Sequence, residues 1–115
     1  MYYCHHHNHT QLLNLVIVLV GYFTANHPDN QSIVQSGSQP SVLQQLANLP
    51  FQYFSQPELK AVLFPTLLSC CHNNAVNMAI LSQEMSWKLI EDFMLSEDGK
   101  ENILVKLVTT SSVKL

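Results

Sequence analysis

Arginine is absent from the 115 residues, and charged side chains of either sign are scarce. Charged residues make up 11% of the chain, and five lysines against eight carboxylates give a formal net charge of −3. A protein that captures a phosphate backbone needs a basic surface, and arginine is the residue best suited to bidentate phosphate recognition. The composition therefore argues against direct nucleic-acid binding and weakens the case for a nucleotide site.

Cysteine is also sparse, with three residues of which Cys70 and Cys71 are adjacent. An odd number with two neighbours is not a disulfide framework, so a reducing, cytosol-facing compartment fits best. The hydrophobic content of 47% is enough for the core of one small domain.

One long apolar run, residues 12–25, lies near the start of the chain. About 20 apolar residues are needed to cross a bilayer, so this run predicts a buried helix and no membrane span. A signal peptide or membrane anchor is the alternative. The leader lacks lysine and arginine and no A-x-A cleavage site follows, which favours the buried helix.

An internal repeat organises the rest of the chain. Asn26-x3-Asn30-x2-Ile33-Val34 recurs 47 residues later as Asn73-x3-Asn77-x2-Ile80-Leu81, and apolar positions before and after the motif match at the same offset. A period of 47 is at the upper end of that expected for HEAT and armadillo units. The predicted fold class is all-α: an armadillo/HEAT-like right-handed helical solenoid fragment of about one and a half to two repeats.

Proline, glycine and capping residues set the expected boundaries. We expect helices from just after Thr10 to about residue 25, at 29–35, from about 41 to 49, from 57 to about 72 with Pro65 inside, and at 85–95. This divides the chain into a His-rich disordered tail (1–10), helical repeats (11–95), and a charged turn with a β-prone, loosely ordered tail (96–115). Since solenoid units bury their faces only against neighbours, self-association of the isolated chain is expected.

Three stretches carry a specific resemblance: LVGYFTANHPDNQSIVQSGSQPSVLQQLANLPFQYFS, LKAVLFPTLLSCCHNN and ILSQEMS. They resemble the C-terminal region of the family of the S phase cyclin A-associated protein in the endoplasmic reticulum, over about Leu12 to Met94. The resemblance implies a large scaffold at the cytosolic face of the endoplasmic reticulum and in the nucleus. It implies binding to cyclin A with its cyclin-dependent kinase, and an adaptor role that brings an mRNA deadenylase to ribosomes. The family carries a zinc finger, but no residue of this chain matches it, so no cofactor is expected in this segment.

The most suggestive metal ligands are Cys4, His5, His6, His7 and His9, because thiolate and imidazole are the usual ligands of zinc. All five lie within six consecutive residues, whereas structural zinc needs two ligand pairs set apart by a folded segment. Adventitious affinity, like that of a histidine tag, is the most that this cluster predicts.

No catalytic pattern stands out. Cys70, Cys71 and His72 are adjacent on one helix, where neighbours point in different directions and are poorly placed to exchange a proton. No P-loop, Rossmann fingerprint or Gly-x-Ser-x-Gly motif occurs. We therefore expect no enzyme, and assign Asn26, Asn30, Asn73 and Asn77 to structural caps at the turns.

The predicted function is a non-catalytic protein–protein interaction scaffold. The alternative is a small secreted or membrane-targeted protein with residues 12–25 as signal or anchor.

Overall fold

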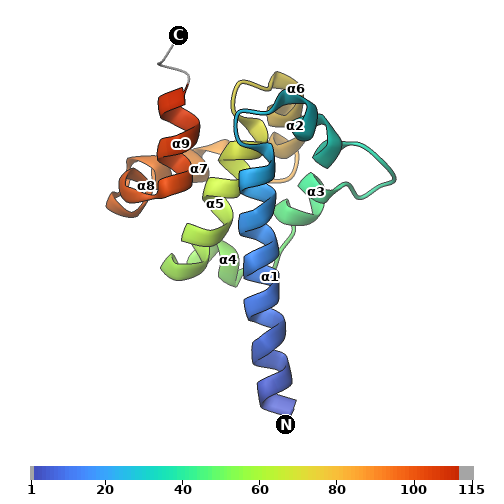
Figure 1. Ribbon diagram of the computed structural model, residues 1–115, viewed down its shortest axis with the longest axis vertical. Coiled ribbons are helices and arrows are strands. Elements are labelled where there is room, and N and C mark those ends of the chain that lie inside the picture. Colours follow the sequence, from blue (N-terminus) through green and yellow to red (C-terminus); the bar gives the residue numbers. More distant parts are fainter. Residues whose placement is uncertain (1, 112–115) are drawn as a thin grey trace.

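The computed structural model describes the backbone of residues 2–111 and the side chains of residues 9–110, and within that range the protein is all-helical, as predicted. The helices are α1 (Tyr2–Thr24), α2 (Pro28–Gln35), α3 (Val42–Ala47), α4 (Gln52–Ser55), α5 (Pro57–Cys71), α6 (Ala75–Ser82), α7 (Trp87–Leu95), α8 (Glu97–Glu101) and α9 (Ile103–Ser111). Figure 1 shows α1 running alongside α5, with its N-terminal half projecting beyond the rest of the molecule. This projection accounts for the long dimension of a particle measuring 51 × 36 × 23 Å.

The short helices begin where the sequence places capping residues. Pro28 opens α2, where its missing N–H costs nothing, and Asp29 lies in the first turn, where a carboxylate favours the helix dipole. Ser41 and Gln44 form a reciprocal capping box at the start of α3. The α3 helix ends at Ala47, two residues earlier than predicted.

Helix α5 lies at the centre of the molecule. Pro57 starts it, and Pro65 is accommodated inside it although proline removes one backbone hydrogen bond from a helix interior. Every residue from Leu63 to Cys71 is buried, because α1, α3, α6, α7 and α9 pack around this half of the helix. The core thus forms around α5, with Phe64 in a T-shaped contact with Phe93 of α7 at 5.7 Å between ring centroids.

The predicted disordered tail at residues 1–10 is wrong for the part that the structure describes, because α1 begins at Tyr2 and Thr10 is not its cap. Once the apolar segment has formed a helix, each added residue extends it without a new nucleation cost. Cys4, His5, His6 and His7 lie in this extension, and their side chains fall outside the described ones; His9 is exposed.

The predicted loose tail at 96–115 is also wrong over residues 97–111, which form α8 and α9; residues 112–115 lie outside the described part. Leu104, Val105 and Val108 of α9 are buried in the core. Their spacing of i, i+1 and i+4 is that of a helix face, and burial against α5 outweighs the weak β-propensity of the segment.

Candidate functional site: the paired turns and the outer face of α1

The two asparagine turns have the same backbone geometry. Asn26 and Asn73 follow the ends of α1 and α5 with positive φ angles of 54° and 55°. Asparagine is one of the few residues that adopts this left-handed conformation readily. In each turn the next residue, His27 or Asn74, caps the following helix through a side-chain acceptor. The caps predicted at Asn26 and Asn73 are therefore one residue earlier than the N-caps that the structure has, and no local pattern had indicated His27 or Asn74.

The second asparagine of each pair ties its short helix back to the preceding long helix. The Nδ2 group of Asn30 donates to the carbonyl oxygen of Phe23 at 2.7 Å, and that of Asn77 donates to the carbonyl oxygen of Cys70 at 2.9 Å. Each acceptor is seven residues earlier, near the end of α1 or α5, where carbonyls lack helical partners. The offset of 47 residues therefore relates two turns with matching side-chain hydrogen bonds.

Gln31 joins the two turns. Its Nε2 group donates to the carbonyl oxygens of Ser69 and His72, and its main-chain carbonyl oxygen accepts from Asn77 Nδ2 at 2.9 Å. Gln31 and Asn77 are both buried, so these bonds form in a low dielectric, where an unpaired polar group is costly. Sequence reasoning missed Gln31, since no local pattern indicates that a glutamine on α2 faces the end of α5.

Helices α1 and α5 approach closely through small and hydroxyl side chains. Thr66 Oγ1 donates to the carbonyl oxygen of Ile17 at 2.9 Å, and Ser69 Oγ donates to that of Gly21 at 2.7 Å. Thr24 Oγ1 lies 3.0 Å from Ser69 Oγ. Thr66 and Ser69, three residues apart on one face of α5, are the sequence signal that could have indicated this contact.

The opposite side of α1 is exposed and apolar. We call this surface the α1 outer face; it consists of Leu12, Leu15, Val16, Leu19, Tyr22 and Phe23. These side chains retain between 45% and 60% of their possible exposure. On a helix of 3.6 residues per turn they fall on the face opposite the buried residues Ile17, Gly21 and Thr24. No charged residue occurs anywhere in α1.

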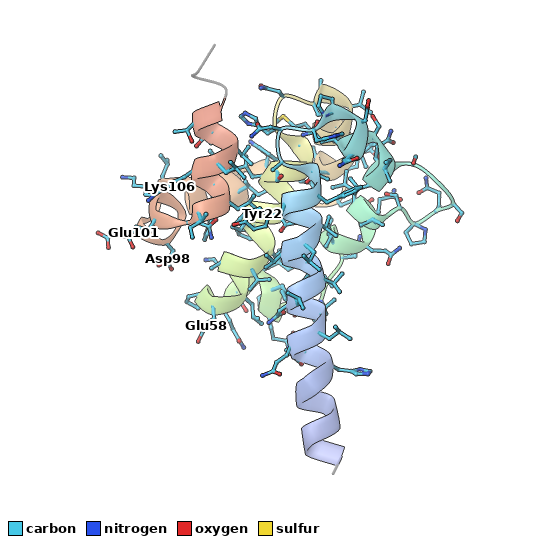
Figure 2. All side chains as sticks on the ribbon, viewed as in Figure 1. Tyr22, Glu58, Asp98, Glu101 and Lys106 are labelled. Atoms are coloured by element: carbon cyan, nitrogen blue, oxygen red, sulfur yellow. The ribbon has the colours of Figure 1, made fainter. Side chains whose placement is uncertain are left out.

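The charged side chains belong to the other helices and the loops. Figure 2 labels Glu58, Asp98, Glu101 and Lys106, which lie on α5, α8 and α9, and shows Tyr22 of α1 on the same side of the molecule. The outer face of α1 therefore has no charge of its own. Such a surface is typical of a site covered by another helix.

The two buried thiols, those of Cys70 and Cys71, are poorly suited to nucleophilic chemistry. Burial raises the pKa of Cys70 to about 12, partly offset by a hydrogen bond from Thr24. Burial, with a smaller effect of Cys70, also raises the pKa of Cys71 to about 12. Both thiols are neutral at pH 7, whereas a nucleophilic cysteine needs a lowered pKa.

Among the residues that the structure describes, no three His, Cys, Asp or Glu side chains are grouped to hold a metal ion. Nor does any helix in the described range combine the length and apolar content needed to span a membrane.

A cavity of about 200 Å³ between α1, α5 and α9 is small for an organic ligand, since ligand sites are typically about 300 to 1,000 Å³. It is lined by Val18, Tyr22, Ala61, Val62, Pro65, Thr66, Asn102, Ile103 and Leu104.

Comparison with known proteins supports the resemblance found in the sequence. No protein-family model matches the chain. The chain is 63% identical over 83 residues to the human S phase cyclin A-associated protein in the endoplasmic reticulum. The match covers 72% of this chain but only 6% of that much longer protein. This chain is therefore a relative of one region of the S phase cyclin A-associated protein in the endoplasmic reticulum, as its sequence predicted.

Proposed function

We propose that this chain is a segment of an armadillo-like, right-handed α-solenoid that acts as a non-catalytic protein–protein interaction scaffold. The observation that supports this most directly is the pair of matching turns 47 residues apart. A repeated unit whose long helices stack side by side, as α1 does on α5, is the structural principle of such scaffolds.

Burial at equivalent positions supports the repeat. Ile17 and Phe64 are both buried, as are Val34 and Leu81 in the short helices and Leu43 and Ile90 in the third helices. The short helices α2 and α6 also contact each other, so both layers of the unit are stacked. Equal burial at an offset of 47 residues is expected if each unit packs on its neighbour in the same way.

The assembly that we propose for this scaffold contains cyclin A. The related human protein is named for its association with cyclin A and for its place in the endoplasmic reticulum. We extend both properties to this chain, with cyclin A and its cyclin-dependent kinase as partners at the cytosolic face of the endoplasmic reticulum and in the nucleus. A ribosome-linked deadenylase adaptor assembly is the second partner that the sequence resemblance implies.

Retention of a purified cyclin A–kinase complex on the immobilised chain tests this function. We expect the complex to be retained and the kinase without cyclin A to pass through. The control for non-specific capture is the same chain with a disrupted core, for example Phe64→Asp. Phe64 is fully buried, so a charge at this position should unfold the chain. Equal capture by the folded chain and this variant, or no capture by either, would remove cyclin A as a partner of this segment.

A further inference from the structure

We propose that a cavity between α4, α5, α7 and α8 is a docking site for a basic peptide segment, which places one large apolar side chain in the cavity and lysines or arginines against the carboxylates at its rim. Docking of this kind requires neither cyclin A nor the scaffold role. The size of the cavity, its aromatic floor and the charge of the surrounding helices carry this inference.

The cavity has a volume of about 310 Å³, larger than that of the cavity between α1, α5 and α9. Ligand sites are typically about 300 to 1,000 Å³, so a site at the lower end of this range suits one large side chain. Three phenylalanine rings form its floor: the ring centroids of Phe54 and Phe93 lie 6.0 Å and 5.7 Å from that of Phe64. Phe64 and Phe93 are buried, so the core holds the floor in place. Such a floor favours an aromatic side chain, which packs on it edge to face.

Three charged side chains line the same cavity: Lys60 from α5, Asp92 from α7 and Asp98 from α8. The two carboxylates outnumber the single ammonium group. Asp92 pairs with Lys88 at 3.2 Å, but both side chains are more than half exposed, and ion pairs of that kind contribute little stability. An incoming lysine or arginine therefore replaces Lys88 at little cost.

The helices that carry these carboxylates are the most acidic part of the chain. Together α7 and α8 contain five carboxylates and two lysines, a local charge of −3. The formal charge of the whole chain is also −3, so the remaining residues are neutral in sum. Because complementary charge steers and orients a partner, this end of the molecule attracts a basic segment and repels an acidic one.

The carboxylates are also the acceptors that the rim offers to a ligand. The other polar side chain of the lining, Ser96, donates to the carbonyl oxygen of Phe93 and accepts from the N–H of Gly99, so its hydroxyl is committed to the junction of α7 and α8. Asp92 and Asp98 stand on two different helices. A ligand with a cationic residue on each side of its apolar one therefore suits the site.

The test uses the amidated peptide Lys-Lys-Phe-Lys-Lys with fluorescein on its N-terminus, titrated with the purified full chain and followed by fluorescence anisotropy at low ionic strength. We expect a dissociation constant on the order of 100 μM. Replacing the phenylalanine of the peptide by alanine leaves the cavity unfilled, so the dissociation constant should rise at least about tenfold. The peptide Glu-Glu-Phe-Glu-Glu should not bind.

Two matched double variants of the chain locate the binding. Asp92→Asn with Asp98→Asn neutralises the rim, and we expect the dissociation constant to rise roughly tenfold. Glu91→Gln with Glu97→Gln removes the same charge from the same two helices at positions that do not line the cavity, and we expect a change of less than about twofold. All four carboxylates are exposed, so both variants should keep the helical circular dichroism spectrum of the wild type.

Three results would each overturn the proposal: no binding of the lysine peptide, equal binding of its alanine form, or equal weakening by the two double variants. Equal weakening would mean a general attraction to acidic helices without use of the cavity. Binding of the glutamate peptide in place of the lysine peptide would assign the site to an acidic ligand held by Lys60. Retention of the cyclin A–kinase complex is measured separately, so either result stands without the other.

Discussion

Gly21 of α1 lies against Thr66 of α5 so closely that a Cβ atom on Gly21 would be 2.5 Å from Thr66 Oγ1 and 3.3 Å from Thr66 Cα. The same added atom would also be 2.5 Å from the Leu104 side chain of α9. Real Cβ atoms do not approach other atoms to 2.5 Å, so the Thr66 and Leu104 side chains would have to move, and Thr66 Oγ1 would lose its position for donating to the carbonyl oxygen of Ile17. The contact of three helices that are distant in sequence therefore depends on this glycine.

Replacing Gly21 with alanine tests that contact. Alanine is the better helix former by about 1 kcal/mol, so propensity alone predicts a gain in stability. We expect instead a loss of about 2 kcal/mol in the free energy of unfolding, because the added methyl group overpacks the α1–α5 contact. Urea unfolding followed by circular dichroism measures the change, and a gain in stability would show that the helices separate freely.

Asn77 and Asn30 occupy equivalent positions in the repeat, but their replacement should lower the free energy of unfolding by different amounts. Asn77 is buried and donates to the carbonyl oxygens of Gln31 and Cys70, whereas the half-buried Asn30 donates to that of Phe23. We expect Asn77→Ala to cost about 3 kcal/mol, since two buried carbonyls lose their donor, and Asn30→Ala to cost about 1 kcal/mol. Asn48→Ala, at an exposed position, is the control. Equal losses at Asn30 and Asn77 would contradict the importance of burial.

The buried thiols predict how stability changes at alkaline pH. The pKa of Cys70 and of Cys71 is raised by burial from 9.0 to about 12, so the folded chain keeps its thiol protons where the unfolded chain loses them. The stabilisation is complete below pH 9 and is lost as the pH rises towards 12, at up to about 1.4 kcal/mol per pH unit for each thiol.

Unfolding free energies of the wild type and of the double variant Cys70→Ala, Cys71→Ala, measured from pH 8 to about 10, isolate this effect. Lysines and tyrosines titrate in both proteins, so the difference between the two slopes belongs to the thiols. We expect the wild type to lose stability more steeply than the double variant. Parallel slopes would mean that the thiols ionise as readily in the folded chain as in the unfolded one.

Helix α9 should contribute to the stability of the whole domain. Val108 is fully buried, so Val108→Ala removes two packed methyl groups, and we expect a loss of about 2 kcal/mol in the free energy of unfolding. Lys106→Ala, on the exposed side of the same helix, should change it by less than about 0.5 kcal/mol. A loosely attached tail would show no difference between the two variants.

Local signals in the sequence were sufficient to predict the helical class, the repeat of 47 residues and the positions of the turns. Pro28, Ser41 and Pro57 act on the residues next to them, so their effect does not depend on the rest of the fold. The apolar run at residues 12–25 likewise predicted a helix, but not that Leu12, Leu15 and Leu19 would remain more than half exposed.

Only the tertiary structure decided which polar groups are buried and which apolar side chains are covered. Gln31 bonds with residues about 40 positions away, and Asn26 donates to the carbonyl oxygen of Leu107 in α9. The segment that forms α9 looks β-prone by itself and becomes a core helix because α5 offers it an apolar face. Capping acts over a few residues of chain, whereas burial depends on surfaces that meet only after folding, and this is why the sequence by itself determined the turns but not the packing.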